Sequence, residues 1–138
     1  MKVASAVVDN IAELLFKIVR FAKVREKVLI ENIEKMHVQD FVPKDLEVGV
    51  FSEQLNDAID THIRQGRLMF RDSSNIKFGY DGDFNVTSVP DRYARELLAT
   101  DIDEYFQLEF DKLLENFLNK KTAMKLLRYH YPTVSVRN

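Results

Sequence analysis

The sequence contains no cysteine, and this absence excludes disulfide bonds, thiolate metal sites and cysteine nucleophiles together. Glycine and proline are scarce, with 4 Gly and 3 Pro among 138 residues, which is too few for a loop-rich all-β fold or a disordered linker. The formal net charge is only −2, so the strongly basic balance of a nucleic-acid-binding protein is also missing. We expect residues 1–138 to form a single folded domain that does not bind nucleic acid.

Long apolar runs are absent as well. Asp9, Glu13, Lys17 and Arg20 interrupt the apolar N-terminal segment, and no run approaches the ~20 apolar residues that span a bilayer. The sequence therefore predicts neither membrane insertion nor a cleaved secretory signal, which needs an uninterrupted apolar stretch.

Both ends of the chain carry strong helical periodicity. A long amphipathic helix is predicted over residues 2–38, which lack Pro and Gly, and another over residues 100–128. The first stripe comprises Val7, Ile11, Leu14, Ile18, Phe21, Val28 and Met36, widened by Leu15, Ala22, Leu29 and Ile33. The second comprises Ile102, Phe106, Phe110, Leu113, Phe117, Met124 and Leu127, with Leu114 and Leu118 beside it. Neither stripe can be buried alone, so we expect coiled-coil-like pairing with each other, with a second copy, or with both.

The middle of the chain is more varied. A shorter helix is predicted over residues 52–65, capped by Ser52 and Gly66, and a small β-hairpin or meander over residues 67–89. Its predicted strands cover residues 67–71, 76–80 and 84–89, with turns at 72–75 and 81–83. Pro90 is expected to open a short helix through Ala99, Thr100 to cap the last helix, and residues 129–138 to form an exposed tail. The predicted fold class is mainly α.

Arg25 and Asn32 interrupt the first apolar stripe one heptad apart. A polar residue at such a position often fixes helix register or partner number at a cost in stability. The alternative is that the stripe curves and both residues reach solvent.

Basic residues also crowd the middle of the first helix. They are Lys17, Arg20, Lys23, Arg25 and Lys27. Such a run can contact anionic lipid or nucleic acid. The nearby Glu26, Glu31 and Glu34 favour the alternative interpretation, a solvated helix face.

The sequence offers no arrangement typical of catalysis, cofactor binding or metal binding. His37, His62 and His130 are widely separated and lack the helical spacing of a metal site. Asp81–Gly82–Asp83 is better explained as a turn than as a calcium loop. Four acidic residues could suggest paired carboxylates for acid–base chemistry, but a favourable interaction with the helix dipole explains them more simply; they are Asp101, Asp103, Glu104 and Glu109. A small helical enzyme that binds an anion remains an alternative; its candidate residues are Arg20, Arg25, Arg64 and Arg128.

The end of the first helix resembles the N-terminal signature of bacterial flagellar rod proteins, and most closely that of the proximal-rod subunit. The residues that carry this resemblance are Arg25, Leu29, Asn32, Ile33, Phe41, Lys44, Asp45 and Leu46. In that family an Arg, a Leu and an Asn-Ile pair precede a Thr-Pro-Gly-aromatic turn and a basic-acidic pair. Here Val38–Gln39–Asp40 stands in place of Thr-Pro-Gly. Asp101–Ile102–Asp103 and Glu115–Asn116 are similar to elements of the family's last helix.

The resemblance implies a structural subunit of the flagellar basal body, exported without a cleaved signal, whose terminal helices pair and polymerise with themselves or with related rod subunits. The implied assembly residues are Ile18, Arg25, Leu29, Asn32, Ile33, Phe41, Lys44, Asp45, Phe106, Leu113, Phe117 and Met124. Arg25 and Asn32 would set lateral register, and Phe41, Lys44 and Asp45 would hold the turn after the helix.

A second hypothesis uses the same stripes differently. A small helical adaptor, chaperone or regulator would bury them in a compact cytoplasmic dimer. Under both hypotheses the protein is not an enzyme, it has no cofactor, and its partners are other protein chains.

Overall fold

The computed structural model describes residues 2–79 and 83–130 and is mainly helical, as predicted. Its helices are α1 (Lys2–Glu34), α2 (Val48–Gln65), α3 (Arg92–Thr100) and α4 (Ile102–His130). Its strands are β1 (Lys44–Asp45), β2 (Ile76–Lys77), β3 (Asn85–Val86) and β4 (Val89–Pro90). The predicted turn residues 81–82 and the predicted tail beyond residue 130 lie outside the described residues.

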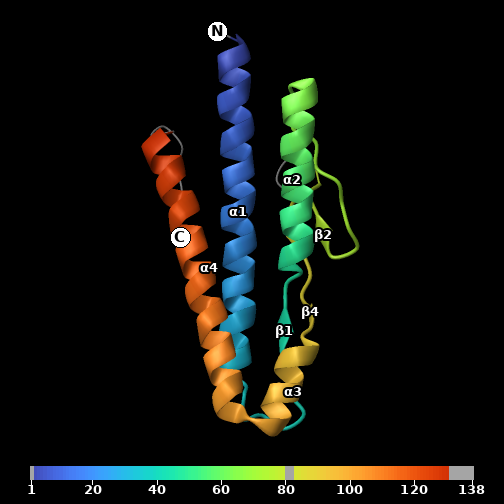
Figure 1. The fold of residues 1–138 in the computed structure, drawn as a ribbon, viewed down its shortest axis with the longest axis vertical. Coiled ribbons are helices and arrows are strands. Elements are labelled where there is room, and N and C mark those ends of the chain that lie inside the picture. The colour runs from blue at the N-terminus through green and yellow to red at the C-terminus, as the bar shows by residue number, and fades with distance from the viewer. Residues whose placement is uncertain (1, 80–82, 131–138) are drawn as a thin grey trace.

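The long helix α1 forms the axis of the molecule (Figure 1). The last helix, α4, returns antiparallel along one side of α1, and α2 lies along the other side. The short helix α3 closes the end of the molecule where α1 finishes and α4 begins. The predicted pairing of the N-terminal and C-terminal helices is therefore confirmed within one chain.

Two apolar clusters hold these elements together. Between α1 and α4, Leu15 and Val19 pack against Ala123, Met124 and Leu127. Burying aliphatic side chains of this kind contributes about 1.5–3 kcal/mol each.

The second cluster lies between α1, α2 and the β segment. Its buried members are Phe21, Leu46, Phe51, Ile76, Phe78 and Phe84. The rings of Phe21 and Phe51 stack with centroids 4.0 Å apart. Large aromatic side chains therefore join α2 to α1, whereas smaller residues such as Ala22 and Ala123 are buried where α1 meets α4.

The strands form two short antiparallel pairs. β2 pairs with β3 through Ile76↔Val86 and Lys77↔Asn85, which agrees with a hairpin in the predicted β segment. β1 pairs with β4 through Lys44↔Pro90 and Asp45↔Val89, a long-range contact that was not predicted. Residues 67–71, predicted as a strand, have no strand structure. Their backbone is bound to α2 instead, where the Gln54 side-chain amide donates to the Arg71 carbonyl at 2.9 Å.

The boundaries of the first two long helices differ from the prediction. α1 ends at Glu34 rather than at residue 38, because the chain turns back through Asp40, whose φ of 61° is left-handed, toward β1. α2 begins at Val48, one turn before Ser52. Burial of Phe51 in the aromatic cluster fixes that first turn, so tertiary packing outweighs the capping signal of Ser52. Gly66 ends α2 in a left-handed conformation, as predicted.

The last two helices also begin at different residues from those predicted. Pro90 belongs to β4, and Asp91 caps α3 by accepting a hydrogen bond from the Ala94 N–H at 3.1 Å. Thr100 is the last residue of α3 rather than the cap of α4. Asp101 takes that place, since its carboxylate accepts from the Glu104 N–H at 3.2 Å. An aspartate caps a helix as well as a threonine does, and the sequence holds both types side by side.

Candidate functional site

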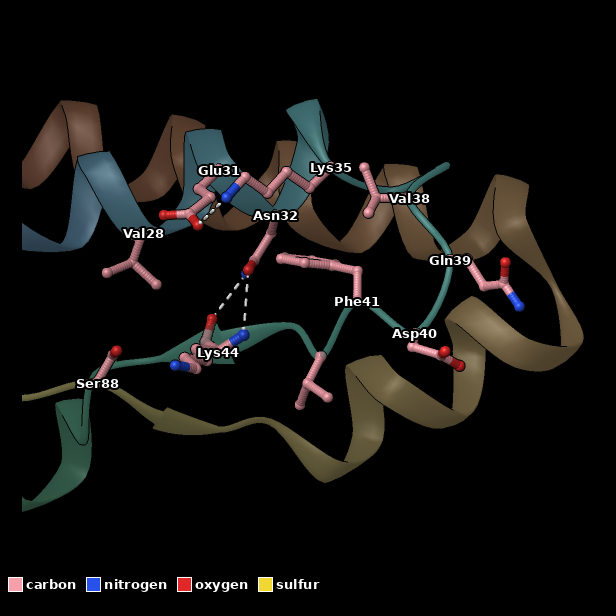
Figure 2. A pocket seen from close by; sticks show the side chains of 11 residues that line it. Val28, Glu31, Asn32, Lys35, Val38, Gln39, Asp40, Phe41, Lys44 and Ser88 are labelled. Carbon is pink, nitrogen blue, oxygen red and sulfur yellow. Dashed lines mark hydrogen bonds and ion pairs between the residues drawn. The ribbon is translucent and has the colours of Figure 1, made fainter.

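A polar corner lies where α1, β1 and α4 meet, and Asn32 is at its centre. Asn32 is 1% exposed. Its amide nitrogen donates to the Lys44 carbonyl at 2.7 Å and to Glu109 Oε1 at 2.6 Å, while its amide oxygen accepts from the Lys44 N–H at 3.1 Å. Figure 2 shows the paired bonds to the Lys44 backbone, with Phe41 pointing toward Asn32. One side chain of α1 therefore fixes both the following strand and the last helix.

Arg25 makes the second link of the corner. Its guanidinium binds the Asp45 carboxylate through two hydrogen bonds, of 2.9 and 3.1 Å. Asp45 also accepts from the Leu46 N–H at 2.7 Å. Such a two-pronged Arg–carboxylate contact is both stronger and more directional than a single hydrogen bond.

Side chains of α4 complete the corner. Glu109 is fully buried, and the Tyr105 hydroxyl donates to the Asn32 carbonyl at 2.7 Å. Lys112 reaches Asp91 at 2.5 Å, Asp45 at 3.4 Å and Glu109 Oε2 at 3.5 Å. Among the described residues, Oε2 of Glu109 accepts no hydrogen bond.

The charges of the corner do not balance when every group is ionised. Asp45, Asp91 and Glu109 face Arg25 and Lys112, so the corner carries an excess of negative charge. Burial raises the pKa of Glu109 above its ordinary value, although hydrogen bonding by Asn32 and the charge of Lys112 oppose the rise. Protonation of Glu109 would neutralise the corner.

The other groups of the corner respond to the same surroundings. Burial acts to raise the pKa of Asp91, but hydrogen bonds from Lys112 and the Ala94 N–H outweigh it, and the pKa is lowered. Burial acts to lower the pKa of Lys112, but the hydrogen bond to Asp91 and nearby carboxylates outweigh it, and the pKa is raised. Both groups therefore stay charged near neutral pH, and the corner is a structural ion-pair network.

The exposed apolar face of α4, called here its outer face, is the second notable feature. It is formed by Phe106, Phe110, Leu114, Phe117 and Leu118, at helical spacings of three and four. These large apolar side chains are 44–52% exposed. Beside them lies a hollow of about 270 Å³, lined by Glu26, Ile30, Phe110, Leu113, Leu114 and Phe117. A helix that is apolar on its solvent side as well as on its packed side is normally covered by another element.

The structure places the predicted assembly residues in three settings: buried or partly buried packing positions, the polar corner, and the outer face of α4. Leu29 and Met124 are buried, and Ile18, Ile33, Phe41 and Leu113 are partly buried. Arg25, Asn32, Lys44 and Asp45 meet in the polar corner. Phe106 and Phe117 belong to the outer face.

The burial of Arg25 and Asn32 decides between the two interpretations of these residues. Arg25 is 7% exposed and Asn32 1%, so the expectation that both reach solvent is wrong. The partners that the structure gives them lie in the same chain, on β1 and α4. They fix the register of α1 against these two elements.

Sequence reasoning did not select Tyr105 or Lys112 as site residues, and it attributed Glu109 to the helix dipole. One signal was available, because Glu109 and Asn116 stand one heptad apart on α4, as Arg25 and Asn32 do on α1. The structure brings these two polar pairs to the same interface. Glu109 binds Asn32, and the Asn116 amide donates to the Ala22 carbonyl at 2.8 Å.

The basic run of α1 is not a uniformly solvated face. Lys17 is 8% exposed, its ammonium lies 5.4 Å from the centroid of the Phe84 ring, and burial lowers its pKa. Three arginines of the enzyme hypothesis also have local contacts: Arg20 donates to the Phe84 carbonyl, Arg25 is paired with Asp45, and Arg64 donates to the Asp60 carbonyl within α2.

No protein family, curated protein or solved structure shows a significant match to this chain. In the described ranges, no helix has the length and apolar character needed to cross a bilayer. Nor do residues 2–79 and 83–130 contain a group of His, Asp and Glu side chains suited to holding a metal ion.

Proposed function

We propose that this protein is a structural assembly subunit of the flagellar-rod kind, which associates with other protein chains through the outer face of α4. The observation that carries this proposal is the character of that face. Five large apolar side chains remain about half exposed on a helix whose opposite side is already packed against α1. Soluble proteins seldom leave a continuous apolar stripe uncovered unless it binds another molecule.

The polar corner supports the same proposal in a different way. Arg25, Asn32 and Asp45, which carry the resemblance to rod proteins, form one connected set of hydrogen bonds at the end of α1. A subunit that packs repeatedly against neighbours needs its helices held in one register, and a satisfied buried network provides that uniqueness.

A discrete dimeric adaptor is the second candidate. It is favoured because Arg25 and Asn32 bind Asp45 and Glu109 of the same chain. The outer face of α4 then remains as the apolar surface for one partner. The two functions differ in the size of the assembly, open-ended for a rod subunit and fixed for an adaptor.

Light scattering coupled to size exclusion, measured over a range of protein concentration, tests the proposal. The wild-type protein should associate, and Leu114→Asp should prevent association while leaving the far-UV circular dichroism of the dilute protein unchanged. Asn119→Asp is the matched control, because Asn119 is an exposed polar residue on another side of α4. A wild-type protein that stays monomeric at every concentration would overturn the proposed function.

A further inference from the structure

The outer face of α4 has opposite charges at its two ends. Asp103 and Asp111 lie toward its N-terminal end, and Lys121, Lys125 and Arg128 toward its C-terminal end. All of these side chains are exposed. Residues 101–111 include no basic residue, so the acidic end is uniform in sign. The apolar stripe, over residues 106–118, follows Asp103, includes Asp111 within its span, and precedes the basic residues.

We propose that this face binds the same face of a second copy of the chain, with the two α4 helices antiparallel about a two-fold axis at Leu114. The proposal rests on the proposed function and names its partner. In this arrangement Asp103 lies opposite the partner's Lys125, and Phe110 lies opposite the partner's Leu118. Leu114 meets its own counterpart on the axis.

Charge complementarity selects the antiparallel orientation. A parallel pair would place Asp103 beside the partner's Asp103, and the basic ends beside each other. Like charges at such positions destabilise helix pairs and opposite charges stabilise them, which sets orientation and partner choice. The antiparallel pair also sets each helix N-terminus near the partner's C-terminus, where the helix dipoles attract.

The hollow beside the outer face gives the second copy a place to pack. The hollow measures about 270 Å³ and is lined mostly by apolar residues of α1 and α4. The partner's Leu114 and Leu118 stand opposite Leu114 and Phe110 of its wall. Two copies then form a four-helix arrangement of α1, α4 and their counterparts. Because the same patch is used on both copies, the contact closes at two chains, and larger assemblies are built from these dimers.

Cysteine cross-linking tests the orientation directly, since the natural chain has no cysteine. Gln107 lies opposite the partner's Lys121 in the proposed pair. Q107C and K121C are prepared separately, mixed, and oxidised. The expected product is a disulfide dimer that contains one chain of each variant, with little dimer from either variant alone. Efficient cross-linking of Q107C to itself would show a parallel pair and overturn the proposal.

Charge reversal gives an independent measurement on the intact protein. Asp103→Lys and Lys125→Glu should each raise the dimer dissociation constant about tenfold, because each creates two like-charge contacts across the two-fold axis. The double variant D103K/K125E should return it to within about threefold of wild type, since it restores both opposite-charge pairs. Asn119→Lys is the control for added charge at an exposed position off this face, because Asn119 lies on the side of α4 that faces α2.

The outcomes separate this proposal from the proposed function. A wild-type protein that does not associate would overturn both the proposed function and the antiparallel pairing. A protein that associates through Leu114, but whose double charge variant is not restored, keeps the function and overturns the antiparallel two-fold pairing. Circular dichroism of every variant confirms that a loss of association is not a loss of folding.

Discussion

The inner and outer faces of α4 differ in the side chains that they carry. The inner face, packed against α1, buries Tyr105, Glu109 and Asn116 in its first half and Ala123, Met124 and Leu127 beyond them. The outer face exposes a continuous stripe of phenylalanine and leucine. The polar side chains of the inner face have defined partners on α1, including the backbone carbonyls of Asn32 and Ala22.

The difference suits the two faces to different tasks. Buried polar groups contribute little net stability, but each demands one specific partner, so the inner face fixes how α4 lies on α1. Apolar side chains contribute binding energy with little directional demand. The outer face is therefore suited to associate with a partner once the inner face has set the position of the helix.

The largest effect is expected from breaking the polar corner. Asn32→Leu should lower the free energy of unfolding by about 3–5 kcal/mol, because it leaves the Lys44 backbone groups and the buried Glu109 carboxylate without their partner. Chemical denaturation followed by circular dichroism measures this loss.

Asn119→Leu is the control for that measurement, since Asn119 is exposed on α4. It should change the unfolding free energy by less than about 0.5 kcal/mol. A loss below about 1 kcal/mol for Asn32→Leu would show that the corner does not determine the register of α1 and α4.

A matched pair of leucine truncations compares the two faces of α4 directly. Leu127 is 0% exposed on the inner face, and Leu118 is 52% exposed on the outer face. Leu127→Ala should lower the free energy of unfolding by about 2–4 kcal/mol. Leu118→Ala should lower it by less than about 1 kcal/mol in dilute protein.

Protein concentration sharpens this comparison. The stability of wild type should rise with concentration as association covers the outer face, and Leu118→Ala should weaken that rise. Equal losses for the two variants in dilute protein would mean that the outer face is already covered within one chain.

The smallest effect concerns pH. The pKa of Glu109 is raised in the folded protein, so its contribution to stability is fully present below the unfolded value of about 4.3 and is lost as pH rises through the folded pKa. Glu109→Gln keeps an acceptor for Asn32 but does not titrate. The free energy of unfolding of the variant should therefore rise relative to that of wild type as the pH increases from about 4.3. The relative rise should total about 1.4 kcal/mol for each unit by which the folded pKa exceeds the unfolded pKa.

Thermal unfolding at a series of pH values measures this difference, with Glu104→Gln as an exposed control on the same helix. If the stability of the variant instead falls relative to that of wild type as the pH rises, the attraction between Glu109 and Lys112 outweighs the cost of burying the carboxylate.

The sequence was sufficient to predict the fold class and the pairing of the terminal helices, because their periodicity extends over many turns. It was less informative about element ends. Phe51 shows why, since its burial against Phe21 starts α2 before the residue with the best capping chemistry. The β1–β4 pair was not predictable from local pattern, because strands of 2 residues carry no periodicity.

The two faces of α4 also explain an error in the predicted stripe. Counting apolar residues placed Phe106, Phe110 and Phe117 on the side that was expected to be buried. The structure packs the side that includes Glu109 and Asn116, because Asn32 and the Ala22 carbonyl satisfy these polar groups. A single-sequence hydrophobic pattern does not contain such long-range partners.

The pairing of β1 with β4 has a consequence for how this chain can change. Lys44–Asp45 and Val89–Pro90 lie side by side, so residues 46–88 leave the helical frame and rejoin it at almost the same point. The spacing of α1, α3 and α4 therefore does not depend on the length of residues 46–88. The β1–β4 pair holds the two ends of this segment together. We expect the fold to accept a longer, shorter or different segment between the two strands, provided that it still covers Phe21 on the adjoining side of α1.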